Sequence, residues 1–193
     1  MIDFIIHLPL TPQGFDAIIV IIDRFTKRVY FIPSKSTDIA EDFANLLLRE
    51  VIRHHGIPTE IISDRDTRFI SRFWTATAKM LGIERHLSSS YHPQSDDQIE
   101  CTNQILQNIL RNYIRYNQSD WDIWLFIVEY IYNDTRHSSI GMTPFYADYA
   151  RKISPMIRQI KDETNVESAN KLAKKLVKLI NIISTNIIQT IQR

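Results

Sequence analysis

Cysteine is almost absent from this 193-residue sequence, which contains Cys101 alone. A single cysteine excludes an internal disulfide and a cysteine-rich zinc module. Long hydrophobic runs are also missing, because the longest, Ala17 to Ile22, is far too short to cross a bilayer. The N-terminus lacks the basic lead, apolar run and cleavage site of a secretory signal. We therefore expect a soluble intracellular protein with no membrane partner and no zinc in this segment.

An excess of charge of either sign is missing overall, since the formal net charge is +1. The balance is uneven along the chain, however. Residues 1–150 carry 14 Lys and Arg against 19 Asp and Glu, whereas residues 151–193 carry 9 against 3, giving −5 and +6. An acidic core with a basic tail is not typical of a protein that simply coats DNA. It favours a core that gathers carboxylates and a tail that supplies positive charge.

The hydrophobic pattern predicts an α/β fold, in which three strands are followed by helices that alternate with two further strands. Strands are expected over 2–6, 17–22, 29–32, 60–63 and 83–87, and helices over about 38–55, 71–81, 96–117, 121–132 and 166–191. We expect Pro33 to end the third strand and Thr37 or Asp38 to cap the first helix. The last helix is basic and amphipathic. The predicted domains are a core over 1–155 and a helical tail over 156–193.

Three acidic residues fall where strands or helices could bring them together. Asp3 lies in the first strand, Asp64 follows the fourth, and Glu100 lies in the helix after the fifth. Crowded carboxylates repel one another unless a positive charge lies between them. The chain offers no His or Cys of ligand spacing, so Mg²⁺ or Mn²⁺ is the most plausible partner. Two such ions about 3.5–4 Å apart can support in-line phosphoryl transfer.

The helix that carries Glu100 has one wholly polar face. Pro93 precedes it, and Ser95 with Gln98 forms a capping box at its start. Helical spacing places one set of polar residues on the same side: Glu100, Asn103, Gln104, Gln107 and Arg111. A polar stripe headed by an acid, on a helix that otherwise packs in the core, indicates a functional site.

These features resemble the integrase of gypsy-type LTR retrotransposons. Asp64 and Glu100 are separated by 35 intervening residues, with Asp3 upstream in a strand, as in the acidic triad of retroviral and retrotransposon integrases. The resemblance covers residues 1 to about 155, and its motifs occur in order. They are Met1-Ile2-Asp3-Phe4, Leu8-Pro9, Asp23-Arg24-Phe25-Thr26-Lys27, His55-Gly56-Ile57-Pro58, Ser63-Asp64-Arg65-Asp66, Phe73-Trp74, Tyr91-His92-Pro93-Gln94-Ser95-Asp96, Tyr132-Asn133, His137-Ser138-Ser139 and Thr143-Pro144-Phe145.

The resemblance implies an RNase H-like fold with a five-stranded mixed sheet flanked by helices. It also implies 3′-end processing and strand transfer of element DNA into target DNA, with two Mg²⁺ or Mn²⁺ ions per active site. Asp3 would bridge both ions, while Asp64 and Glu100 would each complete one coordination sphere. The implied partners are double-stranded DNA and further copies of the chain, as a homodimer or higher oligomer, and the implied location is the nucleus.

Residues around the triad are expected to contact DNA: Tyr91, His92, Gln94, Asp96, Asn103, Gln104, Gln107 and Arg111. Three arginines near Asp64, namely Arg65, Arg68 and Arg72, are expected either to bind phosphate or to form a solvated face. Asp66 is expected to be a surface carboxylate or a helix cap. Trp74, Trp121, Trp124 and Phe126 are expected in the core.

Some positions depart from the family pattern. Asp97 replaces a usual glycine, Cys101 a basic residue and Ala150 a glycine, and neutral Gln104 and Gln107 weaken the attraction to DNA phosphates. Relative to the family, we expect half of the first strand and the flanking zinc-binding and DNA-binding domains to be missing. These departures support a second interpretation: a catalytically weak or inactive transposon-derived remnant that acts as a nucleic-acid-binding or dimerisation module.

Overall fold

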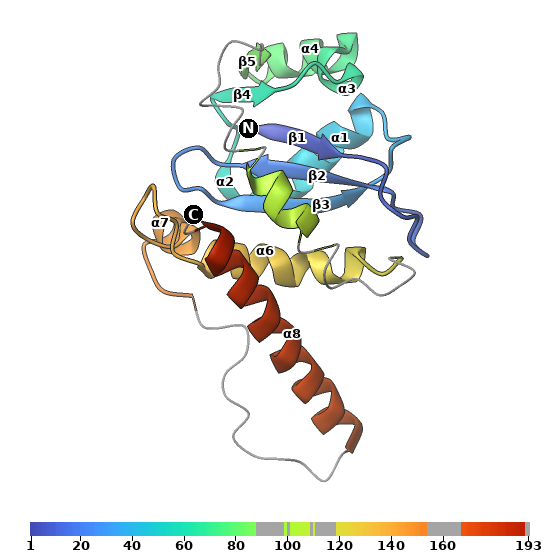
Figure 1. Cartoon of the computed structure of the whole chain (residues 1–193). Helices are drawn as coiled ribbons and strands as arrows, with labels where there is room; N and C mark the ends of the chain where they lie inside the picture. The colour runs from blue at the N-terminus through green and yellow to red at the C-terminus, as the bar shows by residue number, and fades with distance from the viewer. Residues whose placement is uncertain (88–98, 100, 109, 111–118, 154–166, 192–193) are drawn as a thin grey trace. The chain divides into compact units, whose positions relative to one another are not determined.

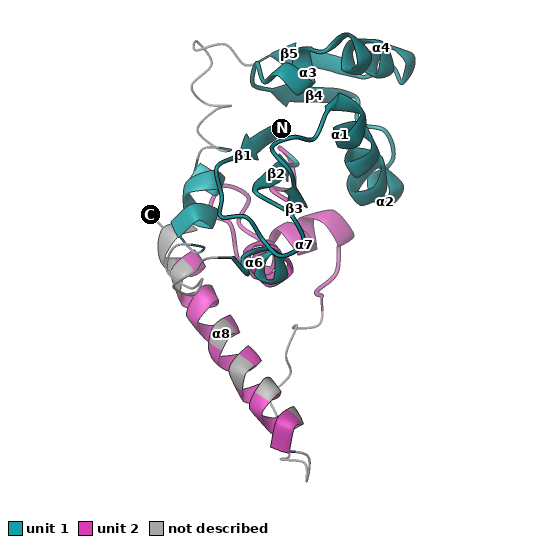
Figure 2. Cartoon of the chain, turned by 90° about the vertical axis from the view of Figure 1, so that its right-hand side faces the viewer, with its two compact units in different colours: residues 1–23, 30–125 teal, residues 24–29, 126–193 magenta. Residues whose placement is uncertain are grey.

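The computed structural model of the chain describes residues 1–87, 99, 101–108, 110, 119–153 and 167–191 (Figure 1). These residues form two compact units, which are coloured separately in Figure 2. Unit 1 comprises Met1–Asp23 and Tyr30–Leu125, and unit 2 comprises Arg24–Val29 and Phe126–Arg193. No helix in the described part of the chain combines the length and hydropathy that a transmembrane span needs.

A five-stranded sheet has the strand order β3-β2-β1-β4-β5. Its strands are β1 (Ile2–Ile5), β2 (Ala17–Ile22), β3 (Val29–Ser34), β4 (Glu60–Ser63) and β5 (Glu84–Leu87). β1 pairs with β2 in the antiparallel sense and with β4 in the parallel sense, and β4 and β5 are parallel. The sheet is therefore mixed, as predicted. All six residues of β2 are buried, because a central strand is covered on both faces.

The helices of unit 1 that follow β3 and β4 are short, and the two after β4 are capped by side chains. They are α1 (Ala40–Leu47), the π-helix η1 (Leu48–Ile52), α2 (Arg53–His55), α3 (Thr67–Ile70) and α4 (Arg72–Met80). Asp66 accepts a hydrogen bond from the Arg68 N–H at the start of α3, and Ser71 accepts one from the Trp74 N–H at the start of α4. Gly82 follows α4 with a φ of 71°, a conformation that favours glycine.

An aromatic cluster fills the space between these helices and one face of the sheet. The Phe43 ring lies 5.0 Å from the Phe69 ring and 4.9 Å from the Trp74 ring, measured between centroids, and all three side chains are buried. Ile2, Ile19 and several other strand residues complete this core. Because neighbouring residues of a strand point to opposite faces, Ile18 and Val20 lie on the other face, where they are also buried.

A helical segment after β5 includes residues 99, 101–108 and 110. Ile105, Leu106 and Leu110 are its buried apolar residues. Further along unit 1, the Trp121 indole N–H donates to the carbonyl of Pro9 at 2.7 Å, just before the 3₁₀-helix η2 (Asp122–Trp124). The remainder of the helix expected over 96–117 lies outside the described residues.

Unit 2 contains most of α6 (Leu125–Asp134), all of α7 (Pro144–Tyr149) and α8 (Glu167–Ile191). The fully buried Asn133 side chain binds both backbone polar groups of one residue, Val29. Its Oδ1 accepts from the Val29 N–H and its Nδ2 donates to the Val29 carbonyl, both at 2.9 Å. The Arg28 guanidinium lies 4.3 Å from the centre of the Phe145 ring. The expected long tail helix is thus present as α8.

Several local expectations were wrong. β3 continues through Pro33. Proline has no N–H to donate to a neighbouring strand, and an edge strand such as β3 tolerates it because one of its sides has no neighbouring strand. The residue at the N-cap of α1 is Ile39, whose N–H donates to Asp42. Phe126 is 60% exposed and does not belong to the core, unlike Trp74 and Trp121. The short helices α3 and α7 were not predicted, because a pattern of one or two turns gives little periodicity.

The Asn133→Ala substitution tests the two hydrogen bonds between Asn133 and the Val29 backbone in unit 2. It leaves the buried N–H and C=O of Val29 without their partners, so we expect the free energy of unfolding to fall by about 2–5 kcal/mol. Asn45→Ala, on the exposed surface of α1, is the matched control and should change it by less than about 0.5 kcal/mol. Urea denaturation of both variants measures the difference. Equal stabilities would contradict a structural role for Asn133.

Candidate active site

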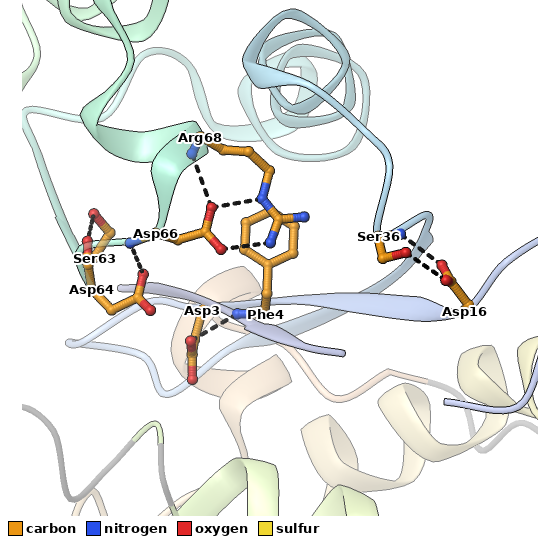
Figure 3. Close-up of polar contacts among 8 residues, drawn as sticks. All are labelled: Asp3, Phe4, Asp16, Ser36, Ser63, Asp64, Asp66 and Arg68. Carbon is orange, nitrogen blue, oxygen red and sulfur yellow. Dashed lines mark hydrogen bonds and ion pairs between the residues drawn. The ribbon is translucent and has the colours of Figure 1, made fainter. Parts of the chain in front are cut away.

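Asp3 projects from β1 on the face opposite to the aromatic cluster. Ile2 and Phe4 pack into that cluster, so the alternation along the strand turns the side chain between them the other way (Figure 3). Its Oδ1 accepts from the Phe4 N–H at 2.8 Å, and its Oδ2 accepts from Asn103 Nδ2 at 2.6 Å. The half-buried carboxylate is therefore held by one backbone and one side-chain donor.

Asp64 is brought beside Asp3 by strand pairing. β4 ends at Ser63, which lies opposite Ile2 in the parallel pairing of β1 and β4, so the next residue of each strand is one of the two acids. Asp64 Oδ1 accepts from the Asp66 N–H at 3.0 Å, a turn that fixes its carboxylate at the start of the loop before α3. In Figure 3 the Asp3 carboxylate and the Phe4 ring leave β1 in opposite directions.

The pKa values of both acids are raised above the ordinary aspartate value. Burial is the main cause for Asp3, and the charge of Asp64 raises its pKa further, while the bonds from Phe4 and Asn103 act in the opposite direction. Partial burial also raises the pKa of Asp64, although this side chain is the more exposed of the two. The negative charge of Asp66 adds to the effect on Asp64, and the Arg68 cation opposes it. The site is a place where additional positive charge would be stabilised.

Asn103 belongs to the helical segment after β5 and lies one turn beyond Glu100 in the sequence. While its Nδ2 binds Asp3, its Oδ1 is buried and has no hydrogen-bond partner among the described residues. Two carboxylates and an amide oxygen are the ligand types that hard divalent cations prefer. The donor set thus fits Mg²⁺ or Mn²⁺. Within the described part of the chain, no group of three acidic, His or Cys side chains could hold a metal ion, and Glu100 lies outside that part.

The structure places only some of the predicted site residues. Asp3, Asp64 and Asn103 come together, Gln104 is exposed, and Gln107 is half-buried on the same helical segment. The other predicted residues lie outside the described part of the chain: Tyr91, His92, Gln94, Asp96, Glu100 and Arg111. Asp97 lies outside it as well, and Cys101 is exposed.

Arg68 differs from the expectation for the three arginines near Asp64. It is only 9% exposed, so it belongs neither to a solvated face nor to a surface that binds phosphate, whereas Arg65 and Arg72 are exposed. Its guanidinium forms an ion pair with Asp66, which does cap α3 as expected. The only signal in the sequence was an acid and an arginine two residues apart, too common a spacing to predict this burial.

A family model and solved structures show which class of protein this chain resembles. Residues 1–93 match the family model described as the integrase core domain. The fold is shared with the catalytic core domain of BIV integrase, with a TM-score of 0.57 and 21% identity over 75% of this chain and 90% of that one. The HTLV-2 integrase catalytic core, solved in complex with magnesium as a trimeric form, gives a TM-score of 0.52 and 16% identity over 76% and 93%. These structures confirm the RNase H-like fold.

Relatives found by sequence point to retrotransposons within this class. The Transposon Tf2-3 and Tf2-4 polyproteins of Schizosaccharomyces pombe are each 34% identical over 169 residues, which is 86% of this chain. The chain is thus similar to an integrase core domain over residues 1–93 and to retrotransposon polyproteins over most of its length, as its motifs indicated. It spans 13% of the length of each of these polyproteins.

Replacement of Asn103 by alanine tests the environment of Asp3. The variant loses a donor that stabilises the carboxylate, so the pKa of Asp3 should rise further. A raised pKa means that the folded chain binds more protons than the unfolded chain between the ordinary aspartate value and the raised one. The free energy of unfolding then falls as pH rises through this window, and Asn103→Ala should extend the window to higher pH.

NMR titration of the Asp3 carboxyl carbon measures this effect directly. Gln104→Ala is the matched control, because it removes an exposed amide from the next position of the same helix. An unchanged Asp3 titration in Asn103→Ala would show that the bond between the two side chains does not form in solution.

Proposed function

We propose that this chain is the catalytic core of a retrotransposon integrase, a polynucleotidyl transferase that inserts element DNA into target DNA. The two reactions would be removal of nucleotides from the element's 3′ ends and attack of the new 3′-hydroxyls on target DNA. One observation carries the proposal: parallel pairing of β1 and β4 brings Asp3 and Asp64 together within an integrase core domain. This is the arrangement that metal-dependent phosphoryl transfer requires.

Asp3, Asp64 and Glu100 would hold two Mg²⁺ or Mn²⁺ ions. When bound, these ions neutralise charge on the attacking and leaving oxygens of the phosphodiester. Support comes from the pKa of both described acids, which burial raises, and from the buried Asn103 Oδ1 beside them. The magnesium in the HTLV-2 catalytic core is consistent with the choice of ion.

The chain's own residues orient the two carboxylates before any ligand arrives. The Phe4 N–H and Asn103 Nδ2 each bind one oxygen of Asp3, and the Asp66 N–H binds one oxygen of Asp64. Each bound oxygen keeps a further lone pair for a cation. Because two of the three donors are backbone groups, one on β1 and one at the start of α3, little reorganisation is needed when the reaction begins.

Double-stranded DNA is the proposed substrate. Gln104 is exposed and Gln107 is half-buried on the helical segment that carries Asn103, and we propose that both contact DNA bound at the carboxylates. The simian T-cell lymphotropic virus intasome shares the fold, with a TM-score of 0.57 and 20% identity over 86% of this chain and 58% of that one, and the HTLV-2 catalytic core was solved as a trimeric form. We extend this to a homodimer or higher oligomer of the present chain, acting in the nucleus where target DNA lies.

A disintegration assay on branched DNA with Mn²⁺ tests the catalytic proposal. Asp3→Asn, Asp64→Asn and Glu100→Gln should each lower the rate by about 100-fold or more, because each removes charge that holds the cations. Asp16→Asn is the matched control. Its carboxylate binds the Ser36 N–H and hydroxyl, apart from the site, so its rate should equal that of the parent chain (Figure 3).

Thermal unfolding with and without Mn²⁺ provides a second measurement. A ligand that binds only the folded chain raises the melting temperature, so Mn²⁺ should stabilise the parent chain and Asp16→Asn but not Asp3→Asn. If the parent chain is inactive in the disintegration assay and shows no response to Mn²⁺, it is instead a remnant that binds nucleic acid or dimerises without chemistry.

A further inference from the structure

Arg68 is a buried arginine whose hydrogen bonds converge on one carboxylate. Its Nε donates to Asp66 Oδ1 at 2.7 Å and its Nη2 donates to Asp66 Oδ2 at 2.6 Å, a bidentate ion pair (Figure 3). The Arg68 N–H also donates to Asp66 Oδ1, at 2.9 Å. These three bonds close the turn between β4 and α3 into a rigid unit.

The same guanidinium lies on the ring of Phe4. The distance from Arg68 Cζ to the centre of the ring is 3.4 Å, which is a close cation–π contact. The Phe4 ring is fixed on its other sides by Phe69, 5.3 Å away between centroids, and by Phe43, 6.2 Å away. Arg68 therefore connects the loop after β4 to strand β1, and it does so on the face of the sheet opposite to Asp3.

Both residues that Arg68 holds also orient an acid of the site. Asp66 donates its N–H to Asp64 Oδ1, and Phe4 donates its N–H to Asp3 Oδ1. A continuous series of contacts thus connects the two carboxylates through one side chain that touches neither of them. In the backbone, β1 and β4 pair at Ile2 and Ser63, and this side-chain connection adds a further point of attachment.

We propose that Arg68 is a positioning residue for the metal-binding carboxylates, which fixes the Asp64 loop against β1 through Asp66 and Phe4. This inference rests on the proposed function, because it assigns Asp3 and Asp64 to divalent cations. The role depends on the planar fork of the guanidinium, which bonds two oxygens while stacking on a ring. A lysine supplies the same charge without that geometry.

The decisive variant is Arg68→Lys, which keeps the positive charge beside Asp66. We expect the dissociation constant for Mn²⁺, measured by electron paramagnetic resonance of the free ion, to rise about 10–100-fold, as is usual when a group that orients metal ligands is lost. In the disintegration assay kcat should fall by a similar factor, while KM for DNA stays unchanged. In the metal-free chain, hydrogen exchange of the Asp66 amide should become faster, because its bond to Asp64 is less well held.

Arg85→Lys is the matched control. Arg85 is another arginine of unit 1 whose guanidinium makes two hydrogen bonds. Its Nη1 donates to Thr75 Oγ1 and its Nη2 donates to the Phe69 carbonyl, and these bonds do not involve Asp66 or Phe4. It should lower the melting temperature without changing Mn²⁺ affinity. If Arg68→Lys behaves like Arg85→Lys, or if it binds Mn²⁺ as tightly as the parent chain, Arg68 is only structural or acts only through its charge, and the proposal is wrong.

A double variant covers the case in which Arg68→Lys does not fold. Asp66→Asn with Arg68→Met removes both charges together, so no buried charge is left unpaired, and Asn retains the capping oxygen. Reduced Mn²⁺ affinity in this folded variant supports the proposal, and unchanged affinity overturns it. Failure of the proposed function looks different, because the parent chain itself would then show no Mn²⁺ binding that depends on Asp3.

Discussion

The burial of Asp3 and Asp64 beside further negative charge is the constraint on which the organisation of unit 1 depends. Burial raises the pKa of both acids, and each stands next to further negative charge. A fold that served stability alone would separate them, because crowded carboxylates favour the unfolded chain at neutral pH. Here they are kept together by paired strands, backbone donors and a buried arginine. Such tension between stability and chemistry is common at active sites.

Strand β1 reconciles the two demands by using its two faces differently. Ile2 and Phe4 enter the aromatic cluster, and Asp3 between them faces the other side, where Asn103 meets it. The core therefore anchors the strand that carries the acid. The same division applies to the loop after β4, since Phe69 fills the core while Asp64 remains at the edge. Packing on one face thus fixes chemistry on the other.

Much of the fold could be predicted because strong local patterns agree with it. The buried run of β2, the strand before Asp64 and the amphipathic tail helix were all found from the pattern of apolar residues. The misses include short elements and one proline whose tolerance depends on β3 lying at the edge of the sheet. Asn103 was expected at the site because of its helical spacing from Glu100, but its bond to Asp3 spans 100 residues of sequence and no local pattern contains it.

The sequence by itself predicted which residues carry the chemistry: three acids on or after predicted strands and in a helix, in an order that resembles integrases. Tertiary structure alone decided how those acids are held. Parallel pairing sets Asp64 beside Asp3, and burial turns Arg68 from an apparent surface cation into a contact of Phe4 and Asp66. The physical reason is that side-chain identity and spacing are local properties, whereas burial and strand adjacency arise only when distant segments pack together.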